Sequence, residues 1–152
     1  MKNIKIMIVD DEERFLATTQ KLLAKKGYDA ITANNGSMAL DLLGQKQIHV
    51  VILDVKMPGM DGIETLKAIK SQYPMVEVVM LTGHATVESA VQGLKSGATD
   101  YLMKPAEIDD LIERAEGAYA RRQQLDEKIR MIQMRKHMGS PRKILEEEKV
   151  NR

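Results

Sequence analysis

The chain of 152 residues contains no cysteine and no tryptophan, and Phe15 is its only phenylalanine. Without cysteine it can form no disulfide, no thiol nucleophile and no cysteine zinc site. Its three histidines, His49, His84 and His137, are too scattered to indicate a histidine metal site. No apolar stretch reaches the length of a membrane span, and no signal-peptide core follows Met1, so we expect a cytoplasmic protein without membrane association. Any metal site must therefore use oxygen ligands.

The chain also lacks an excess of charge of either sign, because its formal net charge is only +1. Charged side chains are nevertheless denser after residue 105 than before it, with basic residues between Arg121 and Lys143 and an acidic run at 146–148. A charged helix face is usually only solvated, and no helix-turn-helix pattern accompanies this one. We therefore do not expect nucleic acid as a partner.

Apolar runs alternate with segments of helical period along the chain. The expected strands are 4–9, 28–33, 50–53, 76–81 and 101–103, and the helices between them end near Gly27, Leu43, Gln72 and Gly97. This order, a strand and a helix repeated five times, predicts an α/β fold with a parallel sheet. One face of the first helix is apolar and is expected to pack on the sheet; it consists of Phe15, Leu16, Thr19, Leu22 and Leu23.

The last helix shows a longer pattern, with spacings of four and three residues from Leu111 to Lys136. Its positions are Leu111, Ala115, Ala118, Arg122, Leu125, Ile129, Ile132 and Lys136. The pattern predicts a helix that runs well past the end of a compact domain. Arg122 and Lys136 interrupt it, so a solvated amphipathic tail and a partner-binding helix both remain open. We divide the chain into a domain at 1–120 and a charged helical extension at 121–152, for which a coiled coil followed by a flexible tail remains open.

Polar side chains follow four of the expected strands directly. The run 50–53 ends at Asp54, and other runs end at Asp10 and Asp11, at Thr82 and at Lys104. Either aspartate of the pair, taken alone, would suggest a helix cap. Because the carboxyl ends of parallel strands meet at the ligand-binding edge of an α/β sheet, we expect these groups to converge. Three crowded aspartates repel each other, and Mg²⁺ or Mn²⁺ with oxygen ligands would relieve that repulsion.

Four motifs at these strand ends resemble, in this order, the receiver domain of two-component response regulators. They are Asp10-Asp11, the segment 54–62 (Asp-Val-Lys-Met-Pro-Gly-Met-Asp-Gly), Thr82-Gly83-His84 and Lys104-Pro105. The resemblance runs from about Lys2 to about Ala120, and the segment 84–104 is also similar to receivers of enhancer-binding activators. It implies a flavodoxin-like (βα)5 fold with strand order 2-1-3-4-5, as in a chemotaxis regulator, here with an extended C-terminal helix.

The resemblance also implies roles for individual residues. Asp54 would accept a phosphoryl group from a phosphohistidine on a sensor histidine kinase. The metal would be bound by Asp11, Asp54 and the backbone carbonyl of Lys56, with Asp10 acting through water. Lys104 would contact the phosphoryl group from the other side.

A switch is implied as well. The Thr82 hydroxyl would turn to the phosphoryl group, and Tyr101 would rotate into the space that Thr82 leaves. The change would reach the face made by the fourth helix, the fifth strand and the fifth helix, so a homodimer through this face or through the C-terminal helix is open. The resemblance further implies a cis peptide at Lys104–Pro105. One departure is Ala106, because many relatives have phenylalanine after this Lys-Pro pair.

Together these observations predict a phosphorylation-activated response regulator, not a dedicated enzyme, whose phosphorylation controls binding to an unknown downstream protein. A phosphorelay intermediate that passes the phosphoryl group to a histidine phosphotransfer protein would need the same residues. The receiver and linker of a transcription activator is a further alternative. A dehalogenase-type phosphatase is disfavoured, because it needs a second aspartate two residues after the nucleophile, where this chain has Lys56.

Overall fold

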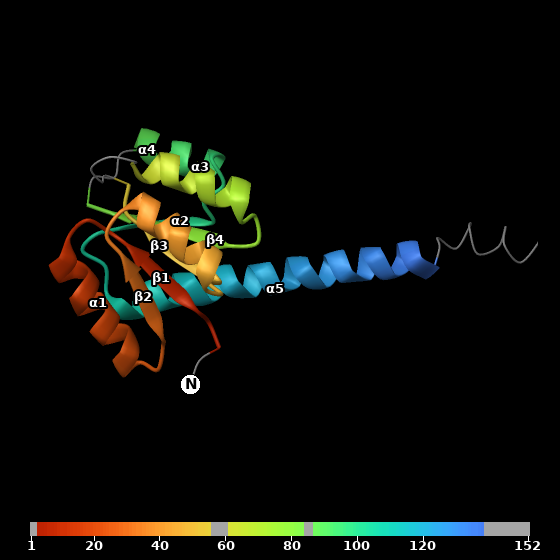
Figure 1. Ribbon diagram of the computed structural model, residues 1–152, viewed down its shortest axis with the longest axis horizontal. Helices are drawn as coiled ribbons and strands as arrows, with labels where there is room; N and C mark the ends of the chain where they lie inside the picture. The colour runs from red at the N-terminus through yellow and green to blue at the C-terminus, as the bar shows by residue number, and fades with distance from the viewer. Residues whose placement is uncertain (1–2, 56–60, 84–86, 139–152) are drawn as a thin grey trace, which may run out of the picture. The chain divides into compact units, whose positions relative to one another are not determined.

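The computed structural model describes residues 3–55, 61–83 and 87–138. A single parallel sheet has the strand order β2-β1-β3-β4-β5 (Figure 1). Its strands are β1 (Ile6–Val9), β2 (Ala30–Ala33), β3 (Val50–Leu53), β4 (Glu77–Thr82) and β5 (Asp100–Met103). The helices that alternate with them are α1 (Glu13–Lys25), α2 (Gly36–Gln45), α3 (Gly62–Gln72), α4 (Val87–Lys95) and α5 (Ile108–Met138). The predicted fold class, strand order and long C-terminal helix are confirmed.

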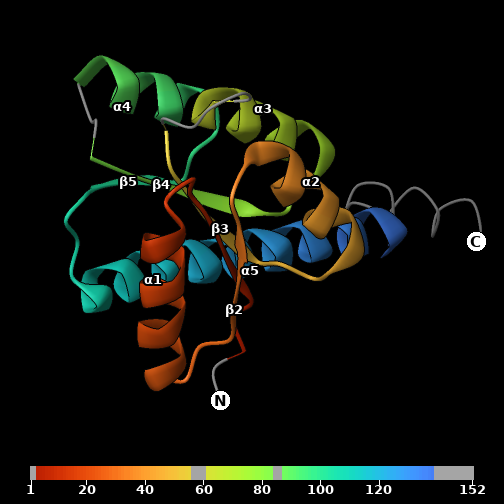
Figure 2. The same cartoon turned by 60° about the vertical axis from the view of Figure 1, so that its left-hand side comes forward.

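The sheet is covered by helices on both faces. Met7 and Val9 point into the apolar cluster beneath α2 and α3, whereas Ile6 and Ile8 point into the cluster beneath α1 and the first turns of α5. This alternation follows from the two-residue period of a strand. In Figures 1 and 2, α4 lies beside α3 on the first of these faces. Strands buried on both faces explain why the sequence shows continuous apolar runs.

Two strands begin two residues later than predicted. β1 starts at Ile6 rather than at residue 4, and β2 starts at Ala30 rather than at residue 28. Ile4 and Tyr28 are buried, with 9% and 4% of their surface exposed, but they precede the paired region of the sheet. An apolar side chain indicates burial but not pairing with a neighbouring strand, so the apolar runs placed the starts of β1 and β2 too early.

The apolar face of α1 is narrower than predicted. Leu16, Thr19 and Leu23 are buried, as expected, and Gly27 ends the helix region with a φ of 89° that suits glycine. The prediction was wrong for Leu22, which keeps 39% of its surface exposed. Leu22 lies at the margin of the buried face, where it lines an apolar pocket instead of the sheet.

The turn from β3 into α3 requires glycine at position 62. A Cβ atom on Gly62 would lie 2.2 Å from the carbonyl oxygen of Asp54. The same close approach allows the Gly62 N–H to donate to the carbonyl of Val55 at 2.7 Å. The Asp61 side chain caps α3 by accepting the N–H of Glu64 at 2.8 Å. Gly62 therefore packs the start of α3 directly against the backbone of Asp54 and Val55, the first residues beyond β3.

The chain divides into two compact units, residues 1–119 and 120–152. In the first unit, Leu111, Ala115 and Ala118 of α5 are buried in the core. The described part of the second unit is the rest of α5, in which the Arg122 Nε donates to Asp126 at 2.9 Å. The predicted tail beyond Met138 lies outside the described residues. Within the part of the chain that the structure describes, every helix is too short or too polar to span a lipid bilayer.

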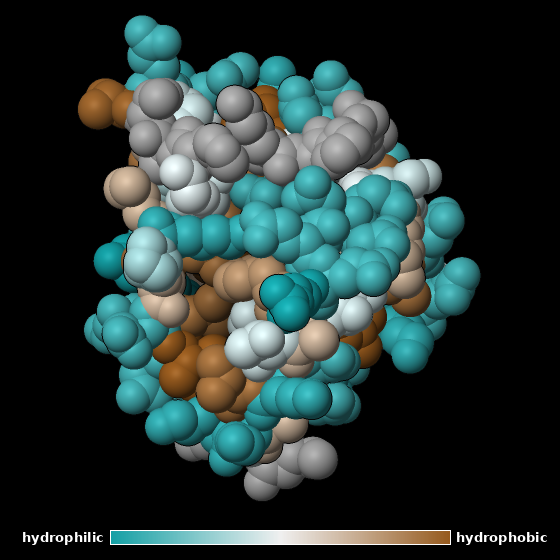
Figure 3. Space-filling model, turned by 90° about the vertical axis from the view of Figure 1, so that its left-hand side faces the viewer, coloured by the Kyte–Doolittle hydropathy of each residue, from teal (hydrophilic) through white to brown (hydrophobic). Residues whose placement is uncertain are grey.

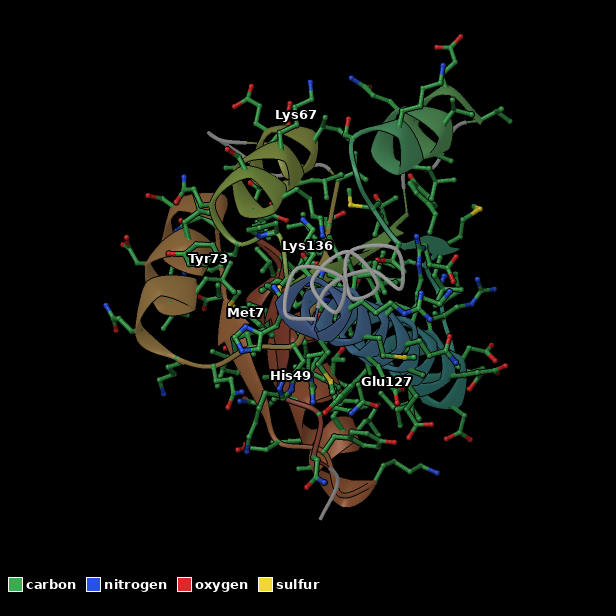
Figure 4. All side chains as sticks on the ribbon, turned by 90° about the vertical axis from the view of Figure 1, so that its right-hand side faces the viewer. Met7, His49, Lys67, Tyr73, Glu127 and Lys136 are labelled. Carbon is green, nitrogen blue, oxygen red and sulfur yellow. The ribbon has the colours of Figure 1, made fainter. Side chains whose placement is uncertain are left out.

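His49 occupies the amino edge of the sheet, just before β3 (Figure 4). Its Nδ1 atom accepts the backbone N–H of Lys5 at 2.9 Å, and its ring stacks on Tyr119 with centroids 4.9 Å apart. Burial, and then the charge of Lys5, lower the pKa of His49 below the usual 6.5. The fold therefore favours the neutral imidazole.

We predict that this histidine makes stability depend on pH. Its unfolded form binds a proton as the pH falls through about 6.5, before the folded form does, so the stabilisation present above that pH is lost on acidification. Urea unfolding of the wild type should show a lower free energy at pH 5 than at pH 7, and His49→Gln should reduce this difference. His137→Gln, at an exposed position, is the control. An unchanged pH dependence in His49→Gln would contradict the assignment.

We predict that Gly62→Ala destabilises the domain by about 1–3 kcal/mol, because the added methyl group overlaps the backbone of residues 54 and 55. The matched control is Gly117→Ala in α5, where a Cβ atom meets nothing within 4 Å. Removing a helical glycine there should stabilise by roughly 0.5–1 kcal/mol. Denaturant unfolding measures both changes, and equal effects in the two variants would show that the turn tolerates a side chain.

Candidate functional site

The ends of β1 and β3 bring two aspartates together. Val9 and Leu53 are partners in the register, and the Asp54 N–H donates to the carbonyl of Val9 at 3.0 Å. On the other side, the Asp10 N–H donates to the carbonyl of Ala33 on β2 at 3.1 Å. Asp10 and Asp54 are thus the first residues beyond two neighbouring strands, both at the carboxyl edge of the sheet.

Asp11 completes an acidic cluster at this edge. One carboxylate oxygen from each of Asp10, Asp11 and Asp54 lies within 4.8 Å of the others. Asp10 and Asp54 are buried, with 1% and 5% of their surface exposed, whereas Asp11 is exposed. Buried carboxylates need a compensating positive charge. The oxygen donors and the open side at Asp11 suit a hard divalent cation that keeps some of its water ligands.

Lys104 brings one positive charge to the same edge. Its ammonium group lies 2.5 Å from Oδ2 of Asp10, and it sits 4.1 Å from the centroid of the Phe15 ring, a cation–π contact. The backbone N–H of Lys104 donates to the carbonyl of Thr82 at 3.0 Å, which fixes the residue at the end of β4. The Lys104–Pro105 peptide is cis, as the resemblance implies.

Asp10 also performs the simpler role of a residue before a helix. Its Oδ1 atom accepts the N–H of Glu12 at 2.9 Å, at the start of α1. The other carboxylate oxygen is the one that faces Lys104. Asp10 is therefore engaged on both sides, by α1 and by Lys104, which leaves Asp11 as the exposed member of the pair.

Thr82 and Tyr101 lie on one face of the sheet. Thr82 ends β4 and is fully buried, and the register places Tyr101 opposite Met80, two residues earlier on β4. Residues two apart on a strand share a face, so Thr82 points to the same side as Tyr101. The Tyr101 hydroxyl lies 3.2 Å from the Ser89 hydroxyl on α4. Thr82 and Tyr101 thus share the face of the sheet on which Tyr101 contacts α4.

Two residues of this site were not assigned from the sequence, and one predicted metal ligand and one motif residue fall outside the part of the chain that the structure describes. Phe15 had one available signal, because it is the only phenylalanine and follows Asp11 by four residues, one helical turn. Ser89 had none, because its contact depends on how α4 packs over β5. Lys56 and His84 lie outside the described residues.

Solved receiver structures have the same fold. The CheY-like receiver domain protein from Methanospirillum hungatei JF-1 matches with a TM-score of 0.76 and 29% identity, over 81% of this chain and 98% of that one. The receiver domain of NtrX from Brucella abortus matches with a TM-score of 0.71 and 35% identity, over 76% of this chain and 98% of that one. This chain therefore contains nearly all of a receiver domain.

Sequence relatives are longer proteins. The transcriptional regulatory protein ZraR of Escherichia coli (strain K12) is 41% identical over 124 residues, which are 82% of this chain and 28% of that protein. The DNA-binding transcriptional regulator NtrC of the same strain is 38% identical over 122 residues, 78% of this chain and 26% of that protein. The chain thus spans about a quarter of these relatives. Because the sequence model of the response regulator receiver domain matches residues 6–116, most of the chain, this protein belongs to the response regulator receiver domain family.

Proposed function

We propose that this receiver accepts a phosphoryl group on Asp54 and thereby controls its binding to another protein. The observation that supports the proposal best is the acidic cluster itself, in which Asp54 is buried, with the Lys104 ammonium at the same edge. Phosphoryl transfer needs little covalent chemistry from a protein beyond positioning and charge neutralisation. We regard the chain as assisting its own phosphorylation and not as a dedicated enzyme.

In the proposed transfer, a carboxylate oxygen of Asp54 attacks the phosphorus of a phosphohistidine on a sensor histidine kinase. The P–N bond breaks, its electron pair returns to the imidazole nitrogen, and an acyl phosphate forms on Asp54. Asp11, Asp54 and the backbone carbonyl of Lys56 would hold Mg²⁺ or Mn²⁺, which supplies positive charge beside the phosphoryl oxygens when bound. Asp10 would bind the metal through a water molecule. The Lys104 ammonium would leave the Asp10 carboxylate and bind a phosphoryl oxygen instead.

The proposed switch uses Thr82 and Tyr101. The Thr82 hydroxyl would donate to a phosphoryl oxygen, and Tyr101 would leave Ser89 and turn towards the vacated space. Both side chains lie on the face that α4 covers, which supports this coupling. The added negative charge would shift an existing equilibrium between two arrangements of α4 and β5. A downstream protein would then recognise the surface made by α4, β5 and α5.

We infer a cytoplasmic location, where a sensor histidine kinase would present its phosphohistidine. The downstream partner depends on which of two kinds of protein the receiver belongs to. ZraR and NtrC are transcriptional regulators that are much longer than this chain, so the receiver and linker of such an activator is one candidate. A phosphorelay intermediate remains the other, because it needs the same acidic edge.

Self-association through α5 is a second proposal with its own observation. Leu125, Ile129 and Ile132 continue the predicted seven-residue pattern and keep 44%, 39% and 54% of their surfaces exposed. Apolar residues at this spacing form the contact between paired helices. A homodimer through α5 would cover them, and one through the surface of α4, β5 and α5 is the alternative.

We predict that acetyl phosphate labels Asp54 in a Mg²⁺-dependent way, because the nucleophile and the metal ligands belong to one chain. The intact mass should rise by one phosphoryl group, and EDTA should prevent the rise. Asp54→Asn should abolish labelling, whereas Asp41→Asn, on the exposed side of α2, should leave it unchanged. Wild-type labelling of Asp54→Asn would refute the assignment.

We predict that Asp11→Asn weakens Mg²⁺ binding more than Asp10→Asn does, because only Asp11 is proposed to contact the metal directly. Loss of an indirect partner typically costs about 10–100-fold in metal affinity, which is the range expected for Asp10→Asn. A Mg²⁺ titration followed by Tyr fluorescence or NMR gives both values. Equal losses would mean that the direct and indirect roles are divided wrongly.

We predict that Ile129→Lys combined with Ile132→Lys lowers the average mass measured by light scattering, because two charges interrupt the apolar face of α5. Gln124→Lys combined with Gln133→Lys adds the same charge at exposed polar positions and should leave the mass unchanged. A monomeric wild type, with or without acetyl phosphate, would rule out this dimer.

A further inference from the structure

An apolar pocket of about 410 Å³ lies between α1 and the start of α5. Phe15 and Leu22 line it from α1, Leu81 from β4, Ala106 from the segment that leads into α5, and Ile108 from the first turn of α5. Sites for small molecules usually have volumes of about 300–1,000 Å³ and mostly apolar walls. Figure 3, which views the carboxyl edge of the sheet, shows apolar side chains gathered in a hollow on this side of the molecule.

Ala106 has the smallest side chain in the pocket lining, which it shares with Phe15 and Leu22. Leu22 keeps 39% of its surface in water, although it belongs to the apolar stripe of α1. A guest that covered this surface would gain the free energy of removing apolar area from water.

The charges around the pocket indicate an uncharged guest. Lys104, which lines the pocket, is paired with Asp10 at 2.5 Å. Lys26, which follows α1 directly and lies four residues after Leu22, is paired with Asp109 at 3.2 Å, next to Ile108. An anionic guest would compete with carboxylates already in place, and a cationic one would meet the Lys104 ammonium.

An aromatic side chain in the pocket lining favours an aromatic guest. The Phe15 ring carries the Lys104 ammonium 4.1 Å from its centroid, and the same side chain forms part of the pocket lining. Aromatic rings pack favourably in offset or edge-to-face arrangements. We propose that the pocket between α1 and α5 binds a small uncharged molecule with one or two aromatic ring systems, in contact with Phe15, Leu22 and Ala106.

Binding can be measured with N-phenyl-1-naphthylamine, an uncharged dye whose fluorescence rises in apolar sites. The full chain has no tryptophan, so its own emission interferes little. We expect saturable binding to the wild type. Ala106→Phe, which fills the pocket, and Leu22→Lys, which places a charge at its mouth, should each weaken binding by about tenfold or more.

Two variants control for the added groups. Ala24→Phe adds the same ring at an exposed position of α1, and Leu94→Lys adds the same charge at an exposed position of α4; both positions lie outside the pocket lining. Both controls should bind the dye as the wild type does. Circular dichroism verifies folding, and Leu22→Lys, an exposed substitution, keeps the test decisive if Ala106→Phe fails to fold.

The proposal is overturned if the wild type shows no saturable binding, or if the controls weaken it as much as the pocket variants. The first of these results has a specific form, in which the dye does not bind and Leu22→Lys slows phosphotransfer from a phosphohistidine donor but not from acetyl phosphate. The pocket would then receive a side chain of the donor protein. Asp54→Asn should bind the dye normally, so a failure of the phosphoacceptor assignment is distinguishable from a failure of this one.

Discussion

Repulsion among the carboxylates of Asp10, Asp11 and Asp54 is the constraint around which the rest of this structure is arranged. Two of these groups are buried, so water cannot fully screen them, and each must be held in place against its neighbours. The backbone does this through the parallel register of β1 and β3, which fixes both residues one step beyond their strands. Lys104 offsets part of the negative charge of the three carboxylates. The negative charge that remains at this edge favours the binding of a cation.

The surrounding elements can be understood as supports for that edge. Gly62 allows α3 to begin against the backbone of Asp54, and the N–H of Glu12 holds one oxygen of Asp10. The bond from Lys104 to the carbonyl of Thr82 places the cation at the end of β4. Lys104 and Thr82 thus bring a cation and a hydroxyl to the edge that carries Asp54, from beyond β5 and from the end of β4.

Much of this arrangement was predictable, because it depends on patterns local in sequence. The alternation of apolar runs and helical segments predicted the fold class, and the residues that end each run predicted the members of the polar edge. The strand order came from the resemblance and not from the pattern. Strand starts, the exposed side of Leu22 and the contact of Tyr101 with Ser89 were not predictable, because each depends on residues that approach from another part of the chain.

The second unit is a different case. Its heptad positions follow from spacing alone, yet spacing does not say what covers Leu125, Ile129 and Ile132. In the first unit the same pattern is satisfied by the sheet, since Leu111, Ala115 and Ala118 are buried there. The same seven-residue pattern thus places buried core residues in the first part of α5 and exposed apolar residues in the part that follows.

The sheet separates two surfaces that meet the same acidic edge. Tyr101 and Ser89 lie on the face covered by α4, whereas Phe15, which holds the Lys104 ammonium, lies on the face covered by α1 and α5. The sheet thus keeps the hydroxyl contact on the α4 face sterically independent of the cation–π contact on the face of α1 and α5, so a change at one contact leaves room for the other.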